Sequence, residues 1–112
     1  MKRILLTIIT VALLLPNALF ATMRNPMIWA DTPDPDVIRV GDYYYMVTTT
    51  MHLMPGAPIM RSRDFTNWET VGFLFDKLTD SPKYNMEEGT AYGRGQWATS
   101  LKYHKGTFYA LF

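Results

Sequence analysis

Short apolar and aromatic runs alternate with turn residues along this chain, a pattern typical of antiparallel β-structure. Strands are predicted over residues 37–40, 43–47, 59–62 and 69–75, with a second hairpin over 96–112. Gly41-Asp42 and Lys105-Gly106 mark the two hairpin turns, where glycine readily adopts the positive φ that tight turns need. Thr48-Thr49-Thr50 can prolong the second strand, because β-branched residues suit extended backbone. No helical period of useful length follows the N-terminal segment, so we expect an all-β fold.

The two hairpins resemble each other, which predicts a repeated architecture. Their turn glycines, Gly41 and Gly106, stand 65 positions apart, slightly more than the ~40–50 residues of a propeller blade. Blades are four-stranded antiparallel sheets, so the spacing fits one blade and the start of a second. The polar, turn-rich residues 76–95 would form a long loop between them, and loops of this length are usually functional. A β-sandwich with similar short strands is the alternative interpretation.

Three carboxylates and two prolines crowd into the six positions from Asp31 to Asp36, immediately before the first hairpin. Each proline fixes its own φ and favours extended backbone in the residue before it. Asp34 lies between Pro33 and Pro35, so its backbone is constrained on both sides, as suits a rigidly mounted reactive acid. Asp and Pro are also common turn formers, and composition alone favours a structural turn. Both interpretations stay open at this point.

Composition narrows the class of protein. Of 112 residues, 48% are hydrophobic and 14% aromatic, which is too apolar for a disordered chain. The formal net charge of +1 does not indicate nucleic acid or an acidic surface as a partner. The absence of cysteine excludes a disulfide framework, a thiolate metal site, a cysteine nucleophile and a lipoprotein anchor.

The first 21 residues have the organisation of a secretory signal peptide. Lys2-Arg3 form the basic start, Ile4 to Leu15 are almost all apolar, and Pro16 precedes the small residue Ala21. The apolar run is shorter than the ~20 residues that a bilayer-spanning helix needs. We expect cleavage after Ala21, although Leu19 departs from the small-residue rule; an uncleaved N-terminal anchor is the alternative. The expected location is secreted or periplasmic, with no membrane association after cleavage.

Five segments carry a resemblance to a known family: Asn25-Pro26, Pro33–Tyr44, Pro55–Ile59, Ser62–Trp68 and Trp97–Gly106. In this order they resemble glycoside hydrolase family 43, the five-bladed β-propeller β-xylosidases, α-L-arabinofuranosidases and arabinanases. The resemblance extends from Asn25 to Phe112. The chain stops on an apolar run at residues 108–112, so we expect residues 22–112 to be a truncated N-terminal part of such a propeller domain, about one and a half blades of the five.

The resemblance implies an inverting mechanism with a general base, a general acid and a carboxylate that tunes the pKa of the acid. The base of the family's Asp-Pro motif matches Asp34. Inversion needs such a carboxylate ~6.5–9.5 Å from the acid, with room for one water. Asp36 is expected to point away from this position and Asp31 to lie in a preceding loop. The two remaining acids are expected to be absent from this chain, which predicts that it is inactive alone.

The resemblance also implies substrate-binding positions. Trp97 matches the tryptophan of a Trp-Ala-Pro motif that lines the sugar pocket, although Thr99 replaces the proline here; a core tryptophan is the alternative. An indole face suits the apolar face of a sugar ring. Met51 stands where relatives often carry a pocket aromatic, and a methionine there would make the wall more adaptable. His52 is a candidate donor to a sugar hydroxyl, or a solvated loop residue.

The implied partner is a xylan- or arabinan-derived oligosaccharide. Glu87 and Glu88 are expected to be solvated loop charges rather than the general acid. No cofactor or metal is expected: a channel calcium is common in the family, but no convincing ligand set is visible in the sequence. Two alternatives remain, a non-catalytic carbohydrate-binding propeller and the related invertase and fructanase clan, whose Asn-Asp-Pro-Asn-Gly pattern this chain lacks.

Overall fold

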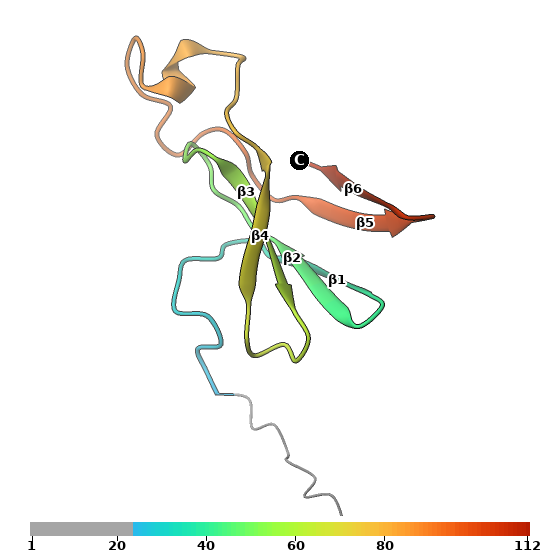
Figure 1. Cartoon of the computed structure of the whole chain (residues 1–112). Coiled ribbons are helices and arrows are strands. Elements are labelled where there is room, and N and C mark those ends of the chain that lie inside the picture. The colour runs from blue at the N-terminus through green and yellow to red at the C-terminus, as the bar shows by residue number, and fades with distance from the viewer. Residues whose placement is uncertain (1–23) are drawn as a thin grey trace, which may run out of the picture.

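The computed structural model describes residues 24–112 and consists of two antiparallel sheets (Figure 1). The larger sheet has four strands in chain order: β1 (Asp36–Val40), β2 (Tyr43–Val47), β3 (Gly56–Ser62) and β4 (Glu69–Phe75). The smaller sheet is the hairpin of β5 (Ser100–His104) and β6 (Thr107–Leu111). In this part of the chain the one helical element is a 3-10 turn, η1 (Pro82–Asn85), and no helix there has the length and hydropathy to cross a bilayer. The predicted signal segment, residues 1–21, lies outside the described residues.

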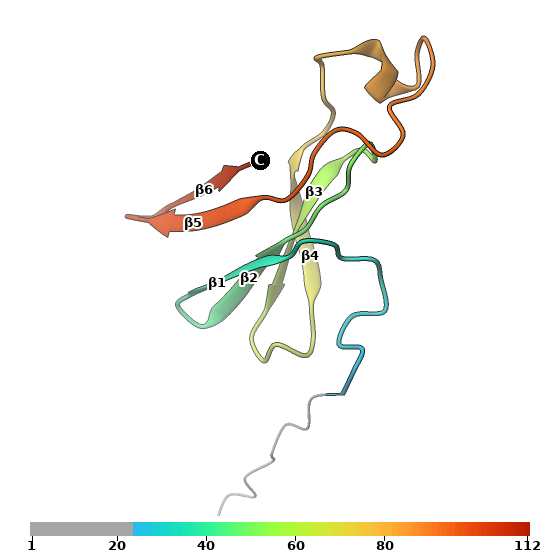
Figure 2. The same cartoon turned by 180° about the vertical axis from the view of Figure 1, so that it is seen from behind.

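The two sheets meet along their first strands, since β1 and β5 lie side by side (Figures 1 and 2). At this seam the Oδ2 atom of Asp36 accepts a 2.7 Å hydrogen bond from the backbone N–H of Leu101. A side chain at the start of β1 therefore sets the position of β5. This bond gives Asp36 a structural role.

The apolar core lies in the wedge between the two sheets. Val47, Ala57 and Leu101 are buried there, and the rings of Tyr45 and Phe108 meet with centroids 4.8 Å apart. Full burial of a side chain of this kind stabilises the fold by about 1.5–3 kcal/mol. Elsewhere in the larger sheet, Gly56 allows the Phe75 ring to cross β3, because a Cβ at Gly56 would lie 2.2 Å from that ring.

The observed strands differ from the predicted ones where the chain enters and leaves the sheet. β2 ends at Val47, and Thr48–Thr50 leave the ladder because their hydroxyls bond to other segments, as described below. β3 begins at Gly56 rather than at residue 59, since Gly56 and Pro58 already lie opposite residues of β4. The second hairpin begins at Ser100, after a single backbone bridge at Gln96.

At the far end of the larger sheet, the turn from Ser62 to Trp68 closes around the Asp64 carboxylate. It accepts bonds from the backbone N–H groups of Thr66 (2.8 Å) and Asn67 (2.7 Å), and from the side chains of Asn67 (2.7 Å) and Ser62 (3.1 Å). These bonds, those from Asn67 foremost, hold the pKa of Asp64 well below its usual range. An ionised carboxylate thus organises this turn.

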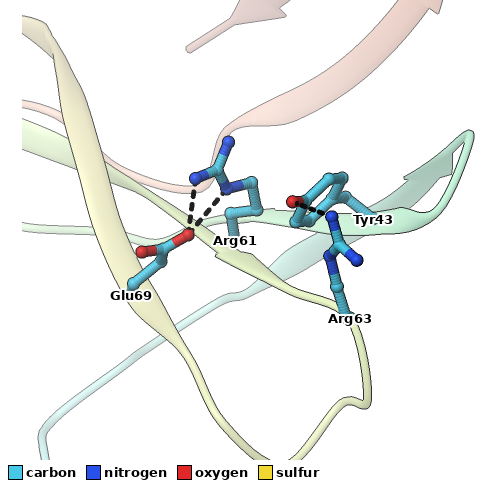
Figure 3. Close-up of polar contacts among 4 residues, drawn as sticks. All are labelled: Tyr43, Arg61, Arg63 and Glu69. Atoms are coloured by element: carbon cyan, nitrogen blue, oxygen red, sulfur yellow. Dashed lines mark hydrogen bonds and ion pairs between the residues drawn. The ribbon is translucent and has the colours of Figure 1, made fainter.

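Next to the turn, Tyr43 packs against two arginines (Figure 3). The guanidinium carbons of Arg61 and Arg63 each lie 4.6 Å from the Tyr43 ring centroid. Arg63 also donates to the Tyr43 hydroxyl at 2.6 Å, and Arg61 donates from Nε and Nη2 to Oε1 of Glu69 at 2.8 and 2.6 Å. Cation–π contacts at exposed sites contribute about 0.5–1 kcal/mol. Both arginines therefore have partners within the fold.

Candidate active site

Asp34 precedes β1 by two residues and has an exposed side chain. Its φ of 48° lies in the left-handed region, which aspartate tolerates better than most residues. Its Oδ2 atom accepts a 3.2 Å hydrogen bond from Oγ1 of Thr49, and no other donor in residues 24–112 bonds to this carboxylate. Residues held in this backbone region cluster at functional sites. Asp34 therefore has one orienting contact and is otherwise open to solvent.

Two buried threonines fix the backbone that carries Asp34. Oγ1 of Thr48 and the backbone N–H of Thr49 both donate to the Pro33 carbonyl, at 2.9 and 3.0 Å. Thr48 and Thr49 are 3% and 4% exposed, so these bonds are shielded from water. The backbone at Pro33 is thus hydrogen-bonded to the residues that follow β2, while the Asp34 side chain stays exposed to solvent.

Gln96 is the buried polar centre of the site, with 1% of its surface exposed. Its Oε1 atom accepts from the backbone N–H and the hydroxyl of Thr50, at 2.8 and 3.2 Å. Its Nε2 atom donates to Oγ1 of Thr99 at 2.7 Å and to the Trp97 carbonyl. In addition, its backbone exchanges two hydrogen bonds with Met51, at 2.9 and 3.0 Å. This satisfied network joins the segment after β2 to the segment before β5.

Gly95 permits this junction to close. Its φ of 117° is a conformation that suits glycine, and a Cβ there would lie 2.3 Å from the carbonyl oxygen of Met51. A side chain at this position would separate the two segments. Gly95 is therefore required both by its backbone conformation and by the close approach of Met51.

Trp97 and Met51, two of the predicted substrate-binding residues, lie on the segments that Gln96 joins. The Trp97 side chain is 66% exposed and that of Met51 39% exposed, and Met51 has a φ of 53°. Within the described residues Trp97 is not a core side chain. A largely exposed indole offers the flat apolar surface that a sugar ring needs.

His52, the third predicted substrate-binding residue, contacts the long loop. Its Nδ1 atom accepts a 3.2 Å bond from the backbone N–H of Gly93, and its ring lies 5.0 Å from that of Tyr92. An accepting Nδ1 leaves the proton on Nε2 in the neutral ring. His52 therefore anchors residues 76–95 to the segment after β2, and its Nε2–H is the ring's remaining donor.

A broad, open hollow lies beside Asp34. It is lined by residues of three segments: Asp34, Pro35 and Asp36 before and at the start of β1, Ala98, Thr99 and Ser100 before and at the start of β5, and Leu111 and Phe112 at the end of β6. The structure thus brings the Asp-Pro cluster together with the residues that follow Trp97. Trp97, Met51 and His52 do not line this hollow themselves; they lie on the adjoining segments.

The buried residues that support the backbone of the site were not predicted from the sequence. Gln96, Thr48 and Thr49 are buried and hydrogen-bonded, whereas the sequence indicates only a β-branched run and a glutamine next to a tryptophan. Three consecutive threonines before a Pro-Gly loop were the available signal. The partners of Thr48 and Thr49 lie 15 positions away and that of Thr50 lies 46 positions away, which local pattern does not reveal.

The family of this chain follows from comparison with known proteins. Residues 23–112 match the sequence profile of glycosyl hydrolases family 43. The chain belongs to glycoside hydrolase family 43. It is 47% identical to a β-xylosidase of Formosa agariphila over 88 residues, and this aligned segment covers 79% of this chain and 15% of that protein. It is 37% identical to a non-reducing end α-L-arabinofuranosidase of Bacteroides ovatus over 108 residues, and this aligned segment covers 95% of this chain and 20% of that protein.

Solved structures of family 43 proteins agree with the fold. A bifunctional GH43-CE protein of Bacteroides eggerthii matches with a TM-score of 0.74 at 48% identity, over 79% of this chain and 12% of that one. A Bacteroides ovatus xyloglucan PUL GH43B structure matches with a TM-score of 0.64 at 38% identity, over 79% of this chain and 17% of that one. The predicted five-bladed β-propeller class is thereby confirmed, with β1–β4 as one blade and β5–β6 as part of a second. This family 43 chain spans about 12–20% of the length of these relatives.

The channel calcium that is common in the family remains an expectation from the resemblance, and the described residues form no cluster that could hold it by themselves. Between residues 24 and 112, no three His, Asp or Glu side chains gather closely enough to hold a metal ion. Of the two carboxylates at the hollow, Asp36 already accepts the Leu101 N–H and Asp34 accepts from Thr49. These residues do not form the oxygen cage of six to eight ligands that calcium takes.

Proposed function

We propose that this family 43 chain supplies the general base of an inverting glycosidase that acts on xylan- or arabinan-derived oligosaccharides. The observation that carries the proposal is the Asp34 carboxylate, exposed beside an open hollow and oriented by one bond from Thr49 on a firmly attached backbone. The substrate class is supported by the names of two relatives, a β-xylosidase and an α-L-arabinofuranosidase.

In the proposed reaction Asp34 removes a proton from a water molecule that attacks the anomeric carbon. A separate acid protonates the leaving oxygen from the opposite side, ~6.5–9.5 Å from the base. Asp36 is bonded to Leu101, and Glu87 and Glu88 are exposed residues of the long loop. We therefore place the general acid and the carboxylate that tunes its pKa outside residues 24–112. The Thr49 hydroxyl would hold Oδ2 of Asp34 and leave Oδ1 for the water proton.

Trp97, Met51 and His52 are proposed to contact the sugar. The exposed indole of Trp97 would support the apolar face of the ring, with Met51 as an adaptable neighbouring wall. His52 would donate from Nε2 to a sugar hydroxyl while its Nδ1 atom keeps the bond to Gly93. These positions all adjoin the junction at Gln96.

Residues 1–21 are proposed to direct the protein to a secreted or periplasmic location. The support is the basic start followed by the apolar run of residues 4–15. N-terminal sequencing of the protein recovered from outside the cytoplasm is expected to begin at Thr22. Recovery of Met1 in a membrane fraction would instead indicate an uncleaved anchor.

A segment exchange tests the proposed base. The matched 88-residue segment of the Formosa agariphila β-xylosidase is replaced by the corresponding segment of this chain, and hydrolysis of aryl xyloside and aryl arabinofuranoside is measured. We expect the exchanged enzyme to be active and Asp34→Asn to lower kcat by about 10²–10⁴-fold, the usual contribution of general base catalysis. The thermal midpoint should stay the same, because Asp34 makes only one side-chain bond. The 112-residue chain by itself is expected to show no turnover.

Asp31→Asn is the matched control, since Asp31 is an exposed aspartate of the same cluster, and it should retain activity. Full activity in Asp34→Asn would contradict the proposal. An exchanged protein that folds and binds oligosaccharides without hydrolysing either substrate would favour the non-catalytic carbohydrate-binding alternative.

A further inference from the structure

A second hollow lies within the long loop between β4 and β5. Its volume is about 560 Å³, and it is lined chiefly by Ser81, Lys83, Tyr84, Thr90, Tyr92 and Arg94. The loop stands beyond the end of the larger sheet where β3 begins (Figures 1 and 2). None of these residues belongs to the hollow beside Asp34.

The charge that lines this second hollow is positive. Lys83 and Arg94 contribute its charged side chains. Among residues 24–112 the ion pair is that of Arg61 with Glu69, so no carboxylate there lies within ion-pair distance of Lys83 or Arg94. Glu87 and Glu88 belong to the same loop but do not line the hollow. The two cations are therefore placed together without an acidic partner.

Local hydrogen bonds shape the loop on both sides of this hollow. In the first limb, Ser81 caps η1 by accepting from the N–H of Lys83. In the second limb, the N–H of Arg94 donates to the Ala91 carbonyl at 2.8 Å. Tyr92 then packs on His52, which ties the hollow to the candidate active site.

We propose that the Lys83–Arg94 hollow is an accessory subsite for a carboxylate-bearing sugar, such as a uronic acid, on the oligosaccharide that occupies the active site. This inference rests on the proposed function. The planar guanidinium of Arg94 matches a carboxylate with two parallel hydrogen bonds, and Lys83 adds a second cation. Tyr92, whose side chain is 82% exposed, offers a face for the sugar ring. The hydroxyls of Ser81 and Thr90 suit the polar groups of a sugar.

Calorimetric titration of the full chain tests the subsite directly. The probes are a neutral xylo-oligosaccharide and one of the same backbone length that carries a single glucuronic acid. We expect the acidic ligand to bind about 5–20-fold more tightly at low ionic strength, and the preference to shrink as salt screens the charges. The double substitution Lys83→Gln and Arg94→Gln should abolish the preference and leave the neutral affinity unchanged.

The matched control is the double substitution Lys102→Gln and Lys105→Gln, which removes the same charge from exposed positions on the second hairpin and should keep the preference. Equal affinity for the two oligosaccharides would overturn the inference. Competition by inorganic sulfate as strong as that by free glucuronate would also overturn it, because it would indicate an unselective anion site.

The exchanged enzyme separates this inference from the proposed function. If it hydrolyses neutral substrate but has the same KM for neutral and acidic substrates, the subsite is wrong and the proposed function stands. If it is inactive while the full chain still prefers the acidic oligosaccharide, the proposed hydrolysis is wrong and the acidic selectivity stands. Absence of the preference in both proteins rejects the subsite.

Discussion

Two aspartates at opposite ends of the same four-stranded sheet have opposite environments. Asp64 accepts bonds from four donors in its own turn and has a lowered pKa. Asp34 accepts one side-chain bond and faces an open hollow. A carboxylate that already accepts several hydrogen bonds is a poor proton acceptor, because taking up a proton would break the bonds that stabilise its charge. Asp64 is thus suited to hold a turn and Asp34 to perform chemistry.

The way each aspartate is held also differs. The turn around Asp64 is local, since its donors lie within three residues of it. The backbone of Asp34 depends on Thr48 and Thr49, which lie 15 positions along the chain, and the adjacent Thr50 is bonded to Gln96 ahead of the second hairpin. The end of the sheet that carries Asp34 is therefore positioned by long-range contacts, and the end that carries Asp64 by its own sequence. Three substitutions test this contrast.

The largest effect on stability is expected from Gln96→Leu. The substitution leaves the N–H of Thr50 and the Trp97 carbonyl without their amide partner, and an unsatisfied buried group costs about 1–3 kcal/mol. We expect a loss of about 2–4 kcal/mol in urea unfolding of the full chain. Asn85→Leu, which alters an exposed amide in η1, should change stability by less than about 0.5 kcal/mol. Equal stability of the two variants would show that the Gln96 network does not support the end of the sheet that carries Asp34.

The next effect is the difference in stability between Gly95→Ala and Gly89→Ala, with Gly95→Ala the less stable of the two. Both glycines have positive φ, 117° and 107°, but only a Cβ at Gly95 meets the backbone of Met51. The shared backbone strain costs about 1–3 kcal/mol in each variant, and the clash adds to it at position 95 alone. Thermal unfolding of both variants isolates that extra loss. If they unfold alike, the close approach between Gly95 and Met51 carries no energy of its own.

The smallest effect is expected from Asp64→Asn, because the turn is exposed and screened by water. The pKa of Asp64 is lowered in the folded chain, so its contribution to stability is present above the ordinary aspartate pKa of about 4 and is lost as the pH falls below it. The variant should melt at a lower temperature near neutral pH and show a shallower decline below about pH 4. Asp80→Asn, at an exposed loop position, should keep the full acid-dependent decline. Parallel acid profiles for the native chain and Asp64→Asn would contradict this account.

The same contrast explains how much the sequence alone could predict. Hairpin turns such as Gly41-Asp42 depend on local backbone chemistry, and the strands on either side of them lie where the pattern placed them. Asp34 was identified through its two flanking prolines and the family resemblance. Its role as the base remains a prediction, but its exposed position beside a hollow is an observed property.

The parts that the sequence did not reveal depend on contacts between distant segments. Gln96 reads as a polar residue at the start of a hairpin, yet its amide is buried because Thr50 and Thr99 supply partners for all of its polar atoms. Likewise, Pro58 breaks the strand pattern, and β3 nevertheless begins before it, opposite Phe75. Tertiary pairing decided both outcomes, and local propensity was overridden.

The backbone bridge between Met51 and Gln96 has a consequence for how much the long loop of this chain can change. It closes residues 51–96 into a ring of chain whose two ends are fixed to each other. The loop of residues 76–95 lies between these two fixed ends. An insertion, a deletion or a substitution in the loop therefore need not move the segments that carry Asp34 and Trp97. The backbone that carries Asp34 and Trp97 can therefore tolerate changes of length and sequence in this loop.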